Sequence, residues 1–265
     1  MGALYKCCMR RAGFALSLLV AAAAVGGCAS LPEGASVVVG ASPWAAQSRG
    51  PGPGPDTPAQ AMAWQHHTLP GKAPSIFSFA RKDGRNALAV TAVGSASLVR
   101  QRLRIEPAEL GELQFSWKVQ QLITGADLAE RDKADSPVRI ILAFDGDRSS
   151  FSPRNAMLSE LALAVTGEPL PYATLIYVWC NTRPPGTVIK NPRTDRIRKL
   201  VVESGPGRLQ RWLDYRRDIR ADYERAFGEA PGALVGLAVM TDTDNTRSSV
   251  NAWYGPVRPS PLAGR

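Results

Sequence analysis

The sequence predicts a mainly β fold: an antiparallel β-sandwich, jelly-roll-like in outline, with two helical excursions. From about residue 87 onward, short apolar runs alternate with clusters of turn residues, which is typical of a sandwich or barrel. β-branched and aromatic side chains dominate these runs, as pleated strands prefer. A chain of 265 residues with 45% hydrophobic composition is also long enough to bury the core of one such domain.

Eight segments fit the pattern of a strand. In residues 113–120 apolar and polar side chains alternate, so one face of this strand is expected to be buried and the other to contact water. The runs 140–144 and 175–179 are apolar on both faces, which predicts central strands. The predicted strands are 87–93, 96–105, 113–120, 138–145, 174–180, 198–204, 234–241 and 251–258.

Two segments have helical rather than strand spacing. Residues 153–167 begin with a proline, end with a glycine and place Met157, Leu161 and Ala164 on one helical face. The second segment, 211–228, also ends with a glycine and is expected to pack against the core. Its apolar stripe at helical spacing consists of Trp212, Tyr215, Ile219, Tyr223 and Phe227.

Residues 1–27 have the composition of a lipoprotein signal peptide. A basic stretch precedes an apolar run at 14–25 that is too short to span a bilayer. The sequence VGGC at 25–28 resembles the bacterial lipobox, and this resemblance implies that Cys28 receives a lipid and becomes the new N-terminus. An ordinary secretory signal is the alternative.

The predicted location is the cell envelope, with attachment to the membrane through the N-terminal lipid. Ala29 follows the cysteine, and by the same resemblance this residue is compatible with the outer membrane, facing the periplasm. Residues 28–60 are rich in Pro, Gly, Ser and Ala, which predicts a flexible tether. The folded β-sandwich domain is expected at 61–265.

The charge and the cysteines narrow the classes of partner. The formal net charge of +9 falls to +6 when Lys6, Arg10 and Arg11 are removed with the signal, and the remaining basic residues form no run. Nucleic acid is therefore not an expected partner of this exported chain, which we expect to be a monomer. After acylation of Cys28 only Cys180 remains, so no disulfide forms within the domain, and a buried thiol is expected.

Signals for catalysis are few. The two histidines, His66 and His67, are adjacent, and neighbouring side chains of an extended strand point to opposite sides, so they rarely share a metal. Neither a nucleophile elbow nor a phosphate-binding glycine loop is present in the sequence. Whether the protein is an enzyme stays open at this point.

The best candidate site is the sequence DTDNT at 242–246. In an extended conformation Asp242 and Asp244 project to the same side and offer hard oxygen ligands, so calcium is the candidate metal. The spacing does not fit an EF-hand, because Arg247 occupies the position of the turn glycine. The alternative is an Asx turn in which these side chains bind only their own backbone.

Two further features lie near predicted strands. Asp127, Asp132 and Asp135 precede the strand that contains Arg139, and a guanidinium drawn into the sheet would need a carboxylate partner from this or the DTDNT segment. Residues 177 and 179, both aromatic, share one face of their strand. They form either a stacking platform for a sugar ring or part of the core.

Five linked motifs give a resemblance to a known family. FSWKV, VRIILAFDG, LPYATLIYVWC, RDIRADYERAFGEAPG and AVMTDTDNT, followed by YGPV, resemble in order and spacing a bacterial envelope family called domain-of-unknown-function family 3047. The resemblance covers about residues 64–257. Members tend to have an acidic residue after the glycine, where this chain has Pro256. The recurring motif positions that the resemblance implies are Trp117, Arg139, Tyr177, Trp179, Asp218, Asp242, Asp244 and Asn245.

Together these observations predict a lipid-anchored envelope protein that recognises a glycan or another envelope component without catalysis. The final strand and the two-faced strands are similar in outline to jelly-roll sandwiches that bind carbohydrate. The alternative is a polysaccharide hydrolase or lyase that uses two carboxylates. The expected ligand-binding residues are Arg139, Tyr177, Trp179, Asp218, Asp242, Asp244 and Asn245.

Overall fold

The computed structural model of the chain describes residues 42–49 and 63–260. The predicted signal peptide and the lipidation site Cys28 lie outside these residues, as do most of the predicted tether and the last five residues of the predicted domain. Within the described part, no helix has both the length and the hydropathy needed to cross a membrane.

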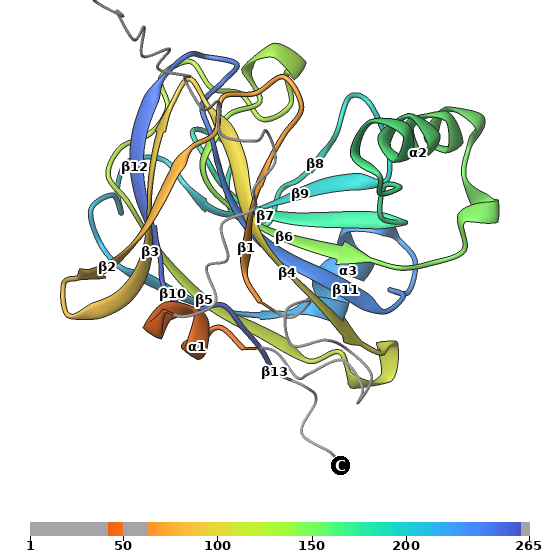
Figure 1. Ribbon diagram of the computed structural model, residues 1–265, viewed down its shortest axis with the longest axis horizontal. Helices are drawn as coiled ribbons and strands as arrows, with labels where there is room; N and C mark the ends of the chain where they lie inside the picture. Colours follow the sequence, from red (N-terminus) through yellow and green to blue (C-terminus); the bar gives the residue numbers. More distant parts are fainter. Residues whose placement is uncertain (1–41, 50–62, 261–265) are drawn as a thin grey trace, which may run out of the picture. The chain divides into compact units, whose positions relative to one another are not determined.

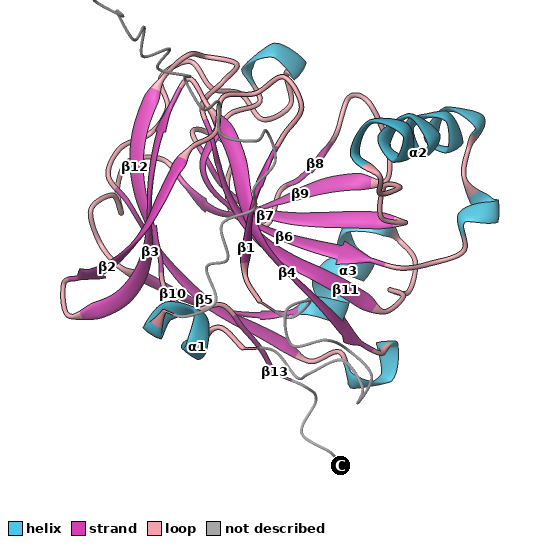
Figure 2. Ribbon diagram, in the orientation of Figure 1, coloured by secondary structure: helices cyan, strands magenta, loops and turns pink. Residues whose placement is uncertain are grey.

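The strands form two sheets that face each other, so the predicted β-sandwich is confirmed (Figures 1 and 2). The first sheet has seven strands in the order β1-β4-β11-β6-β7-β9-β8, and all its neighbours are antiparallel except β7 and β9. Its strands are β1 (Gln65–Thr68), β4 (Ala96–Ile105), β6 (Ser136–Phe144), β7 (Ala173–Cys180), β8 (Val188–Lys190), β9 (Ile197–Ser204) and β11 (Leu234–Asp242).

The second sheet has six strands. Five follow the order β10-β5-β12-β3-β2, and β13 pairs with β5 beside β12. These strands are β2 (Ile76–Lys82), β3 (Arg85–Val93), β5 (Glu112–Val119), β10 (Leu213–Asp218), β12 (Ser249–Tyr254) and β13 (Arg258–Ser260). The helices are α1 (Pro43–Gln47), α2 (Pro153–Thr166) and α3 (Ile219–Phe227), with short 3₁₀ turns at Pro107–Glu109, Arg131–Lys133 and Arg148–Ser150.

The core lies between the two sheets and is rich in aromatic side chains. The alternation predicted for β5 is confirmed, since Phe115 and Trp117 point inward. Phe115 stacks on Tyr177 of the opposite sheet with ring centroids 5.7 Å apart, and Trp117 lies 6.5 Å from Trp179. These pairs connect the sheets and fix which faces of β5 and β7 are buried.

The helix predicted at 211–228 is correct only in its second half. Residues 213–218 form strand β10, which pairs with β5, and α3 begins at Ile219. Asp218 ends the strand and caps the helix, because its Oδ1 accepts a hydrogen bond from the backbone N–H of Ala221 at 2.9 Å. Tyr215 satisfies both helical and strand spacing, and pairing with the exposed edge of β5 selects the strand.

Helix α2 has the predicted boundaries, with Ser152 as its N-cap and Gly167 in the left-handed conformation at its end. Its apolar face points away from the protein: Met157 is 63% and Leu161 58% exposed. The buried side carries Asn155, which bonds to neighbouring loop residues. Figure 1 shows this helix at the margin of the seven-stranded sheet.

Residues 42–49 belong to the folded domain. Ser42 caps α1, and Trp44, only 1% exposed, packs against Trp64 and donates a hydrogen bond from Nε1 to the carbonyl oxygen of Gly255 at 2.9 Å. A Cβ at Gly255 would lie 2.0 Å from Oγ of Ser116, so this close approach requires glycine. The expectation of a flexible tether over 28–60 therefore does not hold for this part of it, because one buried tryptophan anchors the segment.

Candidate functional site

A pocket of about 350 Å³ opens at the end of β11, where the DTDNT sequence begins. We call it the β11 pocket and define it by Lys72, Arg139, Lys199, Asp242 and Asp244, which all line it. β6 and β11 are neighbouring strands of the seven-stranded sheet, and their register shifts between residues 240 and 242. This irregularity lies where the strand gives way to the polar loop.

Arg139 and Asp242 form a nearly buried ion pair. Nη2 of Arg139 lies 2.7 Å from Oδ2 of Asp242, and each side chain is 9% exposed. The same Nη2 donates to the backbone oxygen of Ala134. The sequence-based prediction that Arg139 pairs with a carboxylate from one of the two acidic segments is therefore confirmed.

The carboxyl groups of Asp242 and Asp244 shift each other's pKa in opposite directions. Burial raises the pKa of Asp242 to about 7 against the opposing charge of Arg139, and the hydrogen bond with Asp244 adds to the increase. Burial alone would raise the pKa of Asp244. Hydrogen bonds with Asp242 and Lys72 outweigh burial, so the pKa of Asp244 is lowered. Near neutral pH the pocket can therefore hold one proton shared between two carboxylates.

Two polar atoms of the ion pair lack partners among the described residues. Oδ1 of Asp242 is buried and receives no hydrogen bond, and Nε of Arg139 is buried and donates none. Buried polar groups are nearly always hydrogen-bonded, since an unpaired one costs about 1–3 kcal/mol. The pocket thus combines one unused acceptor with one unused donor.

Asp135 brings a third carboxylate to the site. One oxygen each from Asp135, Asp242 and Asp244 lies within 4.8 Å of the others, a spacing that a metal ion could bridge. Asp135, however, already accepts hydrogen bonds from the backbone N–H of Thr246 at 2.7 Å and from its hydroxyl at 2.6 Å. Since Arg139 and Lys72 neutralise the other two carboxylates, a calcium ion would have to displace cations that are already in place.

Sequence analysis missed Lys199 and Lys72. Lys199 is 3% exposed, and its Nζ donates to the backbone oxygen of Leu128 at 2.7 Å. Burial and the nearby charge of Arg139 lower the pKa of Lys199 to about 8. A lysine inside the apolar strand 197–204 was a usable signal, whereas nothing local in the sequence marked Lys72.

The remaining predicted residues lie elsewhere or act differently. Tyr177 and Trp179 are fully buried between the sheets, so they are core residues rather than an open stacking platform. Asp218 caps α3 and does not line the pocket. Asn245 does line it, and its side-chain amide donates to the backbone oxygen of Arg131 at 3.3 Å.

The histidines form no accessible catalytic pair. Nε2 of His66 lies 2.9 Å from Oγ of Ser97, a possible nucleophile by residue type, but Ser97 is fully buried on β4. Burial lowers the pKa of His66, and burial together with Arg100 lowers the pKa of His67 to about 4. Both side chains are therefore neutral and structural at neutral pH.

Comparison with known proteins identifies the family. The sequence model described as "Protein of unknown function (DUF3047)" matches residues 62–258, which include the β11 pocket and every strand of both sheets except most of β13. The chain belongs to this family. No curated protein matches this DUF3047 chain.

Solved structures of low sequence identity are also similar to this chain. The DUF3047 chain is similar to the xyloglucanase domain of NopAA, a type three effector from Sinorhizobium fredii in complex with cellobiose, at 10% identity and a TM-score of 0.40, over 75% of this chain and 93% of that one. It is also similar to endoglucanase 3 of Trichoderma harzianum, at 8% identity and a TM-score of 0.38, over 75% and 90%. A structure entitled "CBM4 structure and function" matches at 9% identity and a TM-score of 0.33, over 76% and 88%.

Proposed function

We propose that this DUF3047 protein is an exported, lipid-anchored envelope protein that binds a glycan or another hydroxyl-bearing envelope component in the β11 pocket. Binding, without chemistry on the ligand, is the role that the pocket geometry supports best. The signal-like residues 1–27 and the lipobox-like sequence ending at Cys28 support export and anchoring to the outer membrane.

The pairing of an unused donor with an unused acceptor carries the proposal. A hydroxyl group can donate to Oδ1 of Asp242 and can accept from Nε of Arg139, because it has one hydrogen and two lone pairs. Sugars present several hydroxyls at fixed spacing, so they suit such a pair better than a purely anionic or purely cationic ligand. The shared proton of Asp242 and Asp244 lets this wall of the pocket act as either donor or acceptor.

Carboxylate-dependent hydrolysis or lysis of a polysaccharide is the alternative function. Its support is the divergence of two neighbouring pKa values, with Asp242 raised and Asp244 lowered, which is a pattern of acid and base pairs. Glycoside hydrolases, however, place their two carboxyl groups on opposite sides of the scissile bond. One oxygen of Asp242 lies within 4.8 Å of one oxygen of Asp244, so no sugar ring fits between them, and this favours binding.

The test is a glycan array probed with the full chain and three variants. Asp242→Asn and Arg139→Lys are expected to weaken binding at least about tenfold, a loss of about 1.4 kcal/mol. Arg139→Lys keeps the positive charge beside Asp242 but removes the Nε donor. The matched control is Glu160→Gln, which alters an exposed carboxylate on α2 that lies outside both the β11 pocket and the six-stranded sheet, and it is expected to bind as the wild type does.

Three results would overturn the proposal. If binding survives both pocket substitutions, the ligand does not bind in the β11 pocket. If no glycan on the array binds, the ligand is not a glycan of the kinds tested. Shortened glycans recovered from the array would instead establish the hydrolase or lyase. Circular dichroism of each variant shows whether the fold is retained, so that a loss of binding can be assigned to the pocket.

Calcium binding at the β11 pocket is tested in a separate measurement. Because the pKa of Asp242 is about 7, a metal that binds its ionised form would release a proton near neutral pH. Calorimetric titration with calcium chloride in two buffers of different ionisation enthalpy would reveal this release. We expect no heat of calcium binding, since Arg139 and Lys72 already neutralise the carboxylates, and a buffer-dependent heat would establish a metal site.

A further inference from the structure

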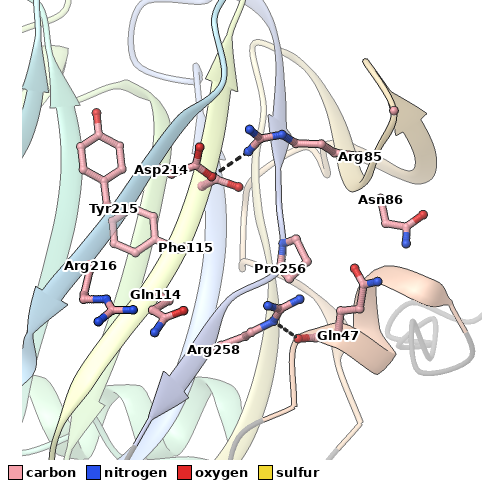
Figure 3. Close-up of a pocket in the computed structure, with 12 residues that line it drawn as sticks. Gln47, Arg85, Asn86, Gln114, Phe115, Asp214, Tyr215, Arg216, Pro256 and Arg258 are labelled. Carbon is pink, nitrogen blue, oxygen red and sulfur yellow. Dashed lines mark hydrogen bonds and ion pairs between the residues drawn. The ribbon is translucent and has the colours of Figure 1, made fainter.

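A second pocket, of about 550 Å³, lies on the outer face of the six-stranded sheet (Figure 3). We call it the α1 pocket, because α1 forms one of its walls. The turn between β2 and β3, the strands β5, β10 and β13, and the link before β13 form the rest. Its volume is within the range of small-ligand sites, about 300–1,000 Å³.

The strand register places two arginines on either side of one glutamine. Gln114 of β5 lies directly opposite Arg216 of β10 and directly opposite Arg258 of β13. All three side chains therefore project from the same face of the sheet, and Figure 3 shows them together. Two positive charges are thus held on either side of one strand, where they repel each other unless an anion neutralises them.

The protein neutralises this pair only in part. Arg216 has one distant carboxylate partner, Oε2 of Glu112 at 3.3 Å from its Nε, and its side chain is 64% exposed. Nε of Arg258 donates to the backbone oxygen of Gln47 at 2.7 Å, and among the described residues no carboxylate pairs with this guanidinium. The pocket therefore carries unused N–H donors from both arginines.

The opposite wall adds further donors on a rigid support. Arg85 follows a tight turn in which Asp83 and Gly84 both have positive φ, 49° and 78°, as expected for a two-residue hairpin. It pairs with Asp214, the only carboxylate among the lining residues, at 2.7 Å. The lining thus has three arginines, three side-chain amides (Gln47, Asn86 and Gln114) and one carboxylate.

We infer that the α1 pocket is a second binding site, for an anionic ligand that bears carboxylate or phosphate groups. Planar guanidinium groups bind both kinds of anion through two hydrogen bonds, and the amides supply additional donors for ligand oxygens. The site is independent of the β11 pocket, because it lies on the other sheet and shares no lining residue with it. Segment 42–49 contributes Gln47 to the lining, and the backbone oxygen of Gln47 holds Nε of Arg258, so α1 helps to form the site.

The test measures binding of the full chain to three polymers: polygalacturonate for carboxylate, polyphosphate for phosphate, and neutral dextran. We expect at least one anionic polymer to bind and dextran not to bind. The double variant Arg216→Ala/Arg258→Ala should weaken this binding at least about tenfold. Which anionic polymer binds identifies the anion that the site prefers.

A matched control separates a built site from general attraction to a basic protein. Arg102→Ala/Arg104→Ala also removes two positive charges, but from exposed positions on β4, where the side chains are 59% and 50% exposed. We expect this control to bind within about twofold of the wild type. Equal losses in the two double variants would overturn the inference, as would the absence of binding to either anionic polymer. The two tests are independent, because Asp242 lines the β11 pocket and not the α1 pocket. The effect of Asp242→Asn on glycan-array binding therefore neither supports nor contradicts anion binding at the α1 pocket.

Discussion

Arg139 and Asp242 occupy neighbouring strands and form a 2.7 Å ion pair whose two side chains are each only 9% exposed. Removing two charges from water costs free energy that their attraction only partly returns. The pair is therefore poorly explained as a source of stability. Its cost is consistent with a functional role for the polar atoms that it holds in place.

Substitution of one partner is expected to be more harmful than substitution of both. Arg139→Met leaves Asp242 buried without its cation and should lower the free energy of unfolding by about 3–5 kcal/mol. The double variant Arg139→Met/Asp242→Leu should recover most of that loss, since an apolar pair needs no compensation. Urea denaturation of the three proteins measures the difference. Equal losses in the single and double variants would contradict this account.

The stability of the protein should depend on the protonation of Asp242. Its folded-state pKa, about 7, is higher than the ordinary value of 3.8 for an aspartate, so the folded state binds this proton more tightly than the unfolded state does. The stabilisation is fully present below about pH 4 and is lost as the pH rises through about 7. Asp244 has the opposite sign, because its lowered pKa contributes stability that is lost as the pH falls.

Comparison with Asp242→Asn isolates this effect, since the amide of the variant can still donate to Asp244. The wild type should lose stability relative to the variant as the pH rises from about 4 to about 7, and the difference should then level off. Chemical denaturation at a series of pH values measures it. A difference that is independent of pH would show that Asp242 is ionised throughout.

Because Trp179 is a core residue, its substitution should reduce the stability of the protein rather than its ligand binding. Its ring is fully buried opposite Trp117, and its Nε1 donates to the backbone oxygen of Gly205 at 3.0 Å. Trp179→Ala should lower the free energy of unfolding by about 3–5 kcal/mol, as measured by urea denaturation. If the folded variant instead kept its stability and lost glycan binding, the residue would be part of a stacking platform after all.

Helix α2 exposes apolar side chains and buries polar ones, which is the reverse of the usual arrangement in a surface helix. Leu161→Lys should change the free energy of unfolding by no more than about 0.5 kcal/mol, because the side chain is already exposed. Asn155→Ala should cost more, about 1–3 kcal/mol, since it leaves Thr194 and Asp195 without the amide that bonds to both. Thermal and urea unfolding of the two variants provide the comparison. A larger effect at Leu161 would contradict the observed orientation.

Anchoring of the N-terminal segment predicts that a chain beginning at residue 61 is less stable than the full chain. Such a chain lacks Trp44, and Trp44→Ala in the full chain should reproduce most of the loss, about 3–5 kcal/mol. Val93→Ala, at a side chain that is 65% exposed, is the control and should change stability by less than about 0.5 kcal/mol. Matching thermal midpoints for the truncated and full chains would contradict this prediction.

Most strands were predictable because burial imposes a pattern on the sequence. The runs 140–144 and 175–179 are apolar on both faces, and the structure covers most of their side chains on both faces. Strand β2 escaped prediction because it is an exposed edge strand, held by backbone pairing with β3 rather than by an apolar face. Strand β10 was assigned to a helix because its aromatic spacing fits both periods, and only its partner β5 distinguishes them.

The candidate site was only half visible in the sequence. Asp242 and Asp244 could be recognised because acidic side chains directly follow an apolar strand, and Arg139 because an arginine interrupts another. Lys72 is far from these residues in the chain, and its contact with Asp244 depends on how the loop before β2 folds. The two arginines that flank Gln114 likewise become neighbours only through the strand register.

The hydrogen bond from Trp44 to Gly255 joins positions 211 residues apart. During synthesis α1 emerges first, yet its docking partner is made only when nearly the whole domain exists. Among the described helices, the one that is made first therefore completes this contact only after most of the domain has been made, and long-range closure of this kind slows folding. Until that closure Nε1 of Trp44 lacks its Gly255 acceptor and the ring has only nearby contacts such as Trp64, so an incompletely made chain presents a point for recognition by chaperones or proteases.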